Sequence, residues 1–102
     1  MITVRSLEWS APFLLANFAV AFGQQVGDPA AGKRLAEATC LECHGVQDTS
    51  RRAPAFSAIA AMPSTTALSL DVFLRTSHPT MPNFILSGTD RGNLIAYIMS
   101  FR

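Results

Sequence analysis

The feature that most constrains this chain is a five-residue motif near its middle, Cys40-Leu41-Glu42-Cys43-His44. Two thiols three positions apart can each form a thioether with one vinyl group of a haem, and the histidine that follows can offer a ring nitrogen to the iron. The chain contains two cysteines, and the motif uses both. The pattern therefore predicts a covalently attached haem c, with Cys40 and Cys43 as the thioether residues and His44 as an iron ligand.

Two other kinds of site contain the same pair of cysteines. A dithiol redox pair would follow a strand in a βαβ unit, and the sequence predicts no such unit. A zinc site would need a fourth ligand besides Cys40, Cys43 and His44, for which His78 is the obvious candidate. The residues alone are compatible with both alternatives, but a C-x-x-C-H motif usually indicates haem attachment.

Residues 1–23 are expected to be a signal peptide. Arg5 precedes an apolar run from Ala11 to Phe22, and the small residues that follow suit cleavage after Gly23, or alternatively after Ala21. The run covers 12 residues, fewer than the roughly 20 that a membrane-spanning helix needs. We therefore expect export, with an uncleaved membrane anchor as the alternative.

Residues 24–102 are expected to form one small domain. Cleavage after Gly23 would leave 79 of the 102 residues, and a domain of that size often needs more than its own apolar core to fold. A covalently held haem would supply the rest, because short helices can pack on its large apolar faces. The formal net charge of the whole chain is +1. The sequence has no long run of basic residues, so it does not indicate a nucleic-acid partner.

Capping residues and apolar spacing predict a helix from Pro29 to about Thr39. Asp28 suits the N-cap, and a proline suits the first helical position. The apolar residues expected to share one face of this helix are Ala31, Leu35 and Ala38.

Two further helices are expected downstream of a short helical turn near Phe56. Ser64 or Thr65 could cap a helix that runs to about Ser77. Its expected apolar stripe consists of Ala67, Leu70, Phe73 and Leu74. The last helix is expected from about Thr89 to Phe101. Its expected buried face consists of Leu94, Tyr97, Ile98 and Phe101.

Two local features of these helices carry expectations of their own. Ser87 and Asp90 have the spacing of a capping box, with aspartate in place of the usual glutamate or glutamine. Gly32, inside the first helix, costs about 1 kcal/mol relative to alanine. A close crossing with another helix would explain this glycine, and a solvent-facing position is the alternative.

The second axial position of the iron decides the chemistry, and several side chains compete for it. Met99 falls in the last helix and is expected to be a core or surface residue. Met62 precedes a proline in a loop, and His78 is expected to be a polar loop residue. Met81 precedes a proline in another loop, 37 residues after His44, which is enough chain to reach across a haem.

From its motif to its last helix, the chain resembles a short bacterial class I cytochrome c. The matching segments are Cys40-Leu41-Glu42-Cys43-His44, Ala53-Pro54-Ala55-Phe56, Met81-Pro82-Asn83-Phe84 and Asp90 to Ser100. The resemblance covers about residues 27–102 and implies an all-α cytochrome c fold, with three main helices plus short turns wrapped around one haem. It also implies Met81 as the distal iron ligand, and Pro54 as the residue whose carbonyl accepts a hydrogen bond from His44.

The resemblance further implies that Gly32 packs against an aromatic residue of the last helix, for which Tyr97 is the match. Two family features are missing. Ala36 stands where the family often has a bulky aromatic residue, and the single tryptophan, Trp9, lies in the expected signal peptide. The chain has one lysine, Lys33, so docking through a ring of lysines is not expected.

For function, the resemblance implies one-electron transfer by a soluble periplasmic carrier with a six-coordinate His/Met haem and no enzymatic activity of its own. The chain would be a monomer, and its partners would be transient redox proteins of the periplasm or membrane, with no small-molecule substrate. Two alternatives stay open. One is a haem c subunit of a larger periplasmic dehydrogenase complex, and the other is a five-coordinate haem that binds ligands if Met81 does not coordinate.

Overall fold

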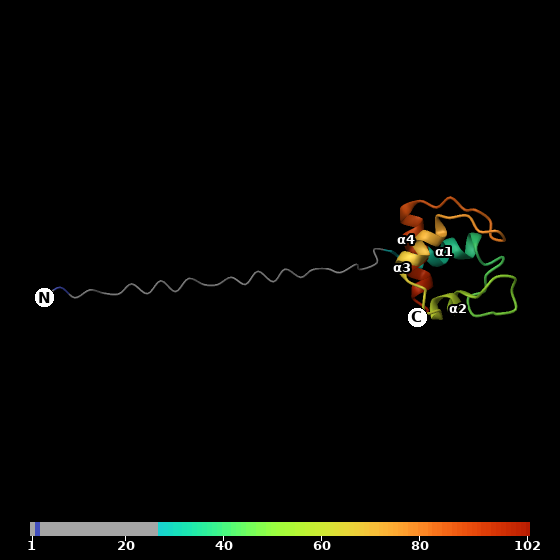
Figure 1. The fold of residues 1–102 in the computed structure, drawn as a ribbon, viewed down its shortest axis with the longest axis horizontal. Coiled ribbons are helices and arrows are strands. Elements are labelled where there is room, and N and C mark those ends of the chain that lie inside the picture. Colours follow the sequence, from blue (N-terminus) through green and yellow to red (C-terminus); the bar gives the residue numbers. More distant parts are fainter. Residues whose placement is uncertain (1, 3–26) are drawn as a thin grey trace.

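The computed structural model describes Ile2 and residues 27–102. Within residues 27–102 the helices are α1 (Pro29–Thr39), α2 (Phe56–Ala61), α3 (Ala67–Leu74) and α4 (Gly88–Met99), as Figure 1 shows. This part of the chain has no strand, so the predicted all-α class is confirmed. None of its helices is long and apolar enough to span a membrane. The expected signal peptide lies outside the described residues apart from Ile2, and its cleavage stays a prediction.

Helix α1 has the bounds that the sequence predicts. The side chain of Asp28 accepts a hydrogen bond of 2.9 Å from the backbone N–H of Ala30, and proline occupies the first turn, where its missing N–H costs nothing. At the other end, the N–H of Cys40 still donates to the carbonyl of Ala36. The C-x-x-C-H motif therefore begins on the C-cap residue of α1.

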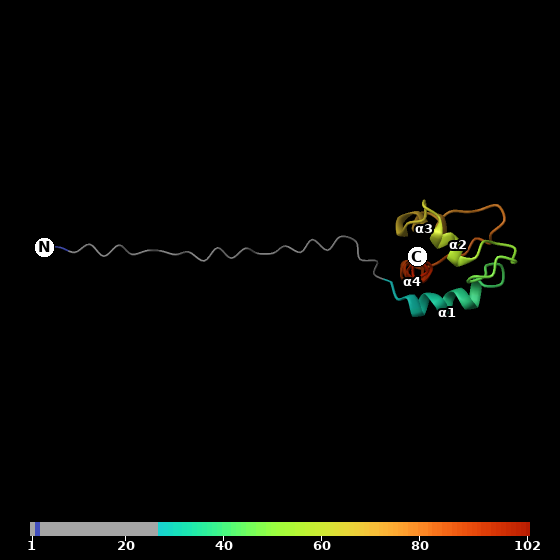
Figure 2. The same ribbon diagram turned by 90° about the horizontal axis from the view of Figure 1, so that it is seen from below.

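Helices α1 and α4 cross in close contact. Figure 2 shows α4 end-on and α1 along its length, so the two helices do not run side by side. A Cβ added to Gly32 would collide with the carbonyl of Asn93 and lie 2.9 Å from the Cβ of Tyr97, and one added to Gly27 would collide with the backbone of Gly92. The expected packing of Gly32 against Tyr97 is confirmed, and this crossing is the reason for the glycine inside α1.

The buried face of α1 differs from the predicted one. Gly32 and Ala36 are buried, Ala31 and Leu35 are half-buried, and Ala38 is exposed. The prediction for Ala38 was wrong because the side of α1 that carries Gly32 and Ala36, four positions apart, is the side that meets α4, and Ala38 lies away from it. The small size of Gly32 and Ala36 lets the two backbones approach each other.

Helix α4 contributes most of the apolar core. Its buried residues are Leu94, Ile95, Tyr97 and Ile98, and Phe101 is half-buried against them. The Ser87 hydroxyl accepts from the N–H of Asp90 at 3.0 Å, but no reciprocal bond from the N–H of Ser87 to the aspartate is found in residues 27–102. Half of the predicted capping box is therefore present, which fits an aspartate that is one methylene shorter than glutamate. The helix ends at Met99, short of the predicted Phe101.

Helix α3 starts later than predicted. Its N-cap is Thr66, and not Ser64 or Thr65. The hydroxyl of Thr66 accepts from the N–H of Ser69 at 3.0 Å, while the hydroxyl of Ser69 accepts from the N–H of Thr66 at 2.8 Å. The correct cap is therefore the residue that has a partner three positions later, as a capping box requires.

Helix α3 also ends early, at Leu74 and not at the predicted Ser77. The hydroxyl of Thr76 donates to the carbonyl of Phe73 at 3.1 Å, and Nε2 of His78 lies 2.9 Å from the same oxygen. Side chains from the following loop thus occupy the carbonyl that further helical turns would use. The loop from residue 75 to residue 87 starts at this point.

An ion pair joins α3 to α4. Nε of Arg91 donates to Asp71 at 2.6 Å, and its Nη1 donates to the carbonyl of Leu86 at 3.2 Å. Arg75 pairs with the other oxygen of Asp71. The hydrogen bond from Arg91 is the main reason that the pKa of Asp71 lies below its usual value, with the charge of Arg75 acting in the same direction.

Candidate haem site

A cavity of about 450 Å³ lies between the helices, within the usual size range of cofactor and small-molecule pockets. Its wall comes from α2, α3 and α4, from the motif after α1, from the loop before α2 and from the loops that flank α3. The wall is mostly apolar and consists of Cys40, His44, Pro54, Phe56, Ile59, Met62, Ser64, Thr65, Ser69, Leu70, Phe73, Leu74, Met81, Leu94 and Ile98.

The C-x-x-C-H motif folds into a tight turn after α1. The backbone N–H groups of Cys43 and His44 donate to the carbonyl of Cys40 at 3.2 and 3.0 Å. Cys40 and His44 are part of the cavity wall, whereas Cys43 is half-buried and is not part of it. Both thiols are free in this structure.

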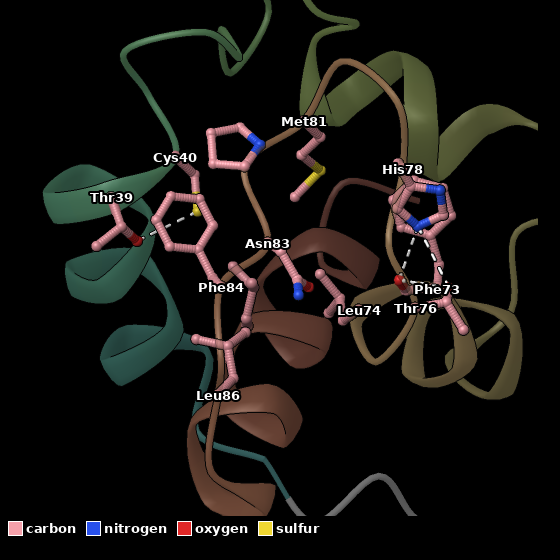
Figure 3. Close-up of a pocket in the computed structure, with 12 residues that line it drawn as sticks. Thr39, Cys40, Phe73, Leu74, Thr76, His78, Met81, Asn83, Phe84 and Leu86 are labelled. Carbon is pink, nitrogen blue, oxygen red and sulfur yellow. Dashed lines mark hydrogen bonds between the residues drawn. The ribbon is translucent and has the colours of Figure 1, made fainter.

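The thiol of Cys40 is half-buried next to a hydroxyl. The Oγ1 atom of Thr39 lies 3.4 Å from the sulfur of Cys40, a contact visible in Figure 3. Burial raises the pKa of the Cys40 thiol, and the hydrogen bond with Thr39 acts in the opposite direction.

The imidazole of His44 is fixed from two directions. Its Nδ1 lies 2.6 Å from the carbonyl oxygen of Pro54, and its ring stacks on Phe56 with the centroids 5.3 Å apart. A carbonyl can only accept, so Nδ1 carries the proton and Nε2 keeps its lone pair. This is the tautomer that a metal-binding histidine needs. The contact between His44 and Pro54 that the resemblance implied is thus present in the structure.

Two methionines border the same cavity. Met81 is half-buried in the loop between α3 and α4, and Met62 is 45% exposed after α2. Figure 3 shows the Met81 side chain between Cys40 on one side and His78 on the other. Met99, the remaining methionine of the described residues, is half-buried against the apolar core and is not part of the wall. Met81 and Met62 are therefore the two thioethers that share a cavity with His44.

His78 lies apart from the wall of this cavity. Its ring stacks on Phe73, and it lines a smaller adjoining pocket of about 20 Å³ together with Met81. In residues 27–102, no three side chains among histidine, cysteine, aspartate and glutamate are arranged to hold a metal ion. The structure thus does not bring together the four residues of the zinc alternative.

The side chains around the cavity suit a haem. Apolar walls match the faces of a porphyrin, and the thiol of Cys40 is at the surface of the cavity, where a thioether would be needed. The free nitrogen of His44 and the thioether of Met81 are the types of donor that hold iron in c-type cytochromes.

Comparison with known proteins gives the same result. The family described as "Cytochrome C oxidase, cbb3-type, subunit III" matches residues 27–98. Cytochrome c-552 of Bradyrhizobium diazoefficiens is 38% identical over 79 residues, which cover 74% of this chain and 76% of that protein. The chain belongs to the c-type cytochrome family. It is an electron-transfer haem protein with a covalently bound haem c, and its helices form the cytochrome c fold. No solved structure gives a significant match.

Some contacts of the cytochrome's site could not be inferred from the sequence. Arg51 donates to the carbonyl of Leu41, inside the haem motif, and pairs with Asp48 at 3.5 Å. The hydroxyl of Thr39 contacts the first cysteine. Threonine and arginine are common surface residues, and only the folded loop shows that these side chains support the motif.

Proposed function

We propose that this cytochrome is a one-electron carrier whose haem is bonded to Cys40 and Cys43 and whose iron is held by His44 and Met81. The main support is that the imidazole of His44, fixed by Pro54, and the thioether of Met81 border one apolar cavity. When bound, the haem supplies an iron that alternates between the ferric and ferrous states.

The carbonyl of Pro54 has two effects on His44. It fixes the orientation of the ring, and it accepts a hydrogen bond from the Nδ1–H group, which makes Nε2 a stronger electron donor to a metal. Phe56 stacks on the same ring and restricts its rotation. His44 is therefore held in one orientation by groups that do not depend on the oxidation state.

Coordination by Met81 would leave no open position for a substrate, which favours a carrier over a catalyst. A thioether ligand stabilises ferrous iron and raises the reduction potential. The apolar wall acts in the same direction, because a low-dielectric environment disfavours the additional positive charge of ferric iron. We therefore expect a fairly high reduction potential.

The test of this ligand set is the weak far-red absorption band of sulfur-ligated ferric haem. We expect the band in the wild-type protein and in Met62→Ala, and we expect Met81→Ala to lose it. Met62 is the matched control because it is the other methionine of the cavity wall. Survival of the band in Met81→Ala, with loss in Met62→Ala, would reassign the distal ligand to Met62. Carbon monoxide affinity of the ferrous wild-type protein equal to that of Met81→Ala would support a five-coordinate haem instead.

For location, we propose a soluble periplasmic monomer that residues 1–23 export. Transient redox proteins of the periplasm or membrane would be its partners. Isolation of the native protein from the periplasmic fraction with Gln24 at its N-terminus is the expected result. Recovery of the haem in the membrane fraction, on a chain that retains residues 1–23, would show a membrane anchor.

A haem subunit of a larger enzyme is the second candidate. It is favoured by the matching family model, whose description names a subunit of an oxidase, and a periplasmic dehydrogenase complex is another possible setting. Gel filtration of the native protein separates the candidates. Elution of the haem at the size of the single chain supports the free carrier, and co-elution with other polypeptides at constant ratio supports the subunit.

A further inference from the structure

We propose that His78 is a positioning residue that holds Met81 at the haem cavity by attaching the Met81 turn to the end of α3. This inference rests on the proposed ligation by Met81. His78 itself is outside the wall of the main cavity, so it would act through Met81 and not on the iron.

Two contacts attach His78 to the same residue of α3. Its ring lies on the ring of Phe73 with centroids 3.5 Å apart and an interplanar angle of 13°. Its Nε2 lies 2.9 Å from the backbone oxygen of Phe73, and because a carbonyl can only accept, Nε2 is the donor. The hydroxyl of Thr76 lies 3.4 Å from the same nitrogen. Figure 3 shows the two rings overlapping and the polar contacts beside them.

The backbone connects this attachment to Met81. His78 and Met81 face each other in an isolated antiparallel bridge, with Pro79 and Thr80 forming the turn between them. Proline fixes its own φ angle, which stiffens so short a turn. Met81 therefore cannot leave the cavity by a movement of the turn unless the bridge breaks or His78 moves with it.

Phe73 is a suitable anchor because it borders both spaces that Met81 borders. It lines the main cavity and the smaller pocket. Helix α3 is in turn tied to α4 by the pair of Asp71 and Arg91. The chain of contacts thus runs from α4 through α3 to His78 and the distal loop.

The attachment is local. Among the described residues, neither His78 nor Phe73 belongs to the apolar core formed around α4. Loss of the His78 side chain should therefore loosen the Met81 turn while the crossing of α1 and α4 stays intact.

The test uses haem-loaded protein with four substitutions. His78→Phe keeps a ring for stacking and loses the N–H donor, whereas His78→Gln keeps a donor near the position of Nε2 and loses the ring. His78→Ala loses both. Thr80→Ala is the matched control, because it changes the same turn without touching either contact.

The readout is the affinity of the ferrous protein for carbon monoxide, which competes with Met81 for the iron. One neutral hydrogen bond or one aromatic stack corresponds to about a fivefold change in an equilibrium. We expect carbon monoxide affinity to rise about fivefold in His78→Phe and in His78→Gln, and by more than tenfold in His78→Ala. The helical circular dichroism signal should stay at the wild-type level, and Thr80→Ala should behave as wild type.

Two results would overturn the inference alone. The first is a carbon monoxide affinity of His78→Ala equal to that of Thr80→Ala. The second is a higher carbon monoxide affinity that is accompanied, in all three His78 variants, by loss of the helical circular dichroism signal. Met81→Ala separates this failure from failure of the proposed ligand set. If Met81→Ala keeps the far-red band of the ferric protein, the ligation by Met81 fails and the role of His78 fails with it. If Met81→Ala loses the band, the ligand set stands whatever the His78 variants show.

Discussion

At the scale of the residue, a backbone carbonyl controls the state of the histidine. The oxygen of Pro54 accepts a hydrogen bond from the Nδ1–H group of His44, so the lone pair of Nε2 is left for a metal. Because this acceptor belongs to the main chain, a side-chain substitution at position 54 does not delete it. What the proline ring adds is a fixed φ angle at the residue that carries the acceptor.

Substitution Pro54→Ala should therefore affect stability more than ligation. We expect the free energy of unfolding to fall by about 0.4–1 kcal/mol, because the unfolded chain gains backbone freedom. Guanidinium titration of the haem-loaded protein measures this change. The far-red band of the ferric protein should persist, and its loss would show that the proline ring is itself required for the geometry of the site.

Some residues of the candidate site can be recognised in the sequence, and others only in the folded structure. Cys40, Cys43 and His44 share a motif whose spacing follows from the chemistry of attachment, whereas Met81 was selected among several candidates by the resemblance to class I cytochromes c. His78 gave no comparable indication, because its contacts are with a ring and a carbonyl of α3 that only the folded loop brings within reach. Side chains that act through tertiary contacts have no fixed spacing to a motif.

At the scale of the element, the crossing of α1 and α4 depends on glycine, which has no side chain to keep the two backbones apart. Gly32→Ala should destabilise the haem-loaded protein by about 1–3 kcal/mol, because the new Cβ would collide with the backbone of α4. This range is the net effect, since the collision also cancels the gain of about 1 kcal/mol that alanine brings inside a helix.

Gly88→Ala is the matched control for Gly32→Ala. A Cβ at Gly88 would meet only the end of the Arg91 side chain, at 3.9 Å. We expect little change in its thermal unfolding midpoint. Equal midpoints for the two variants would contradict the close crossing.

The ion pair between α3 and α4 predicts a dependence of stability on pH. In the folded protein the pKa of Asp71 lies below its ordinary value of 3.8. Its contribution to stability is therefore present above pH 3.8 and is lost as the pH falls through the lower pKa of the folded state. Asp71→Asn removes this titration.

Measurement of the urea midpoint between pH 6 and pH 3 checks this expectation. The difference between wild type and Asp71→Asn should be largest near neutral pH and should shrink as the solution becomes acidic. A difference that is constant over the whole range would mean that the charge of Asp71 does not stabilise the fold.

The helices also show how far local sequence determines an element. The start of α1 followed from Asp28 and the proline after it, because both act within the first turn. The start of α3 was predicted one or two residues early because several neighbouring hydroxyls could cap it, and only Thr66 has a reciprocal partner. The buried face of α1 was predicted incorrectly, because that face is determined by the packing of α4 and not by the spacing of apolar residues within α1.

At the scale of the whole molecule, the cavity is large for so small a domain. Without a haem, the apolar side chains that line this space of about 450 Å³ would be open to water, and full burial of one such side chain contributes about 1.5–3 kcal/mol. A few of these side chains together correspond to much of the net stability of about 5–15 kcal/mol that is typical of a domain. The helices of this cytochrome should therefore need the haem to pack stably.

A variant that cannot attach haem tests this requirement. We expect the double variant Cys40→Ser, Cys43→Ser, prepared without haem, to lose most of its helical circular dichroism and its cooperative thermal transition. The wild-type haem-loaded protein, measured alongside, should show both. A cooperative transition near the wild-type midpoint in the haem-free variant would show that the polypeptide core is sufficient.

The contact of Gly32 with Asn93 and Tyr97 joins positions more than sixty residues apart. A polypeptide made from its amino end presents Cys40 and Cys43 long before α4 exists, so the surface against which α1 packs is the last to be synthesised. We therefore expect the two thiols to stay accessible for haem attachment until α4 has packed on α1, because the domain cannot close before that contact forms.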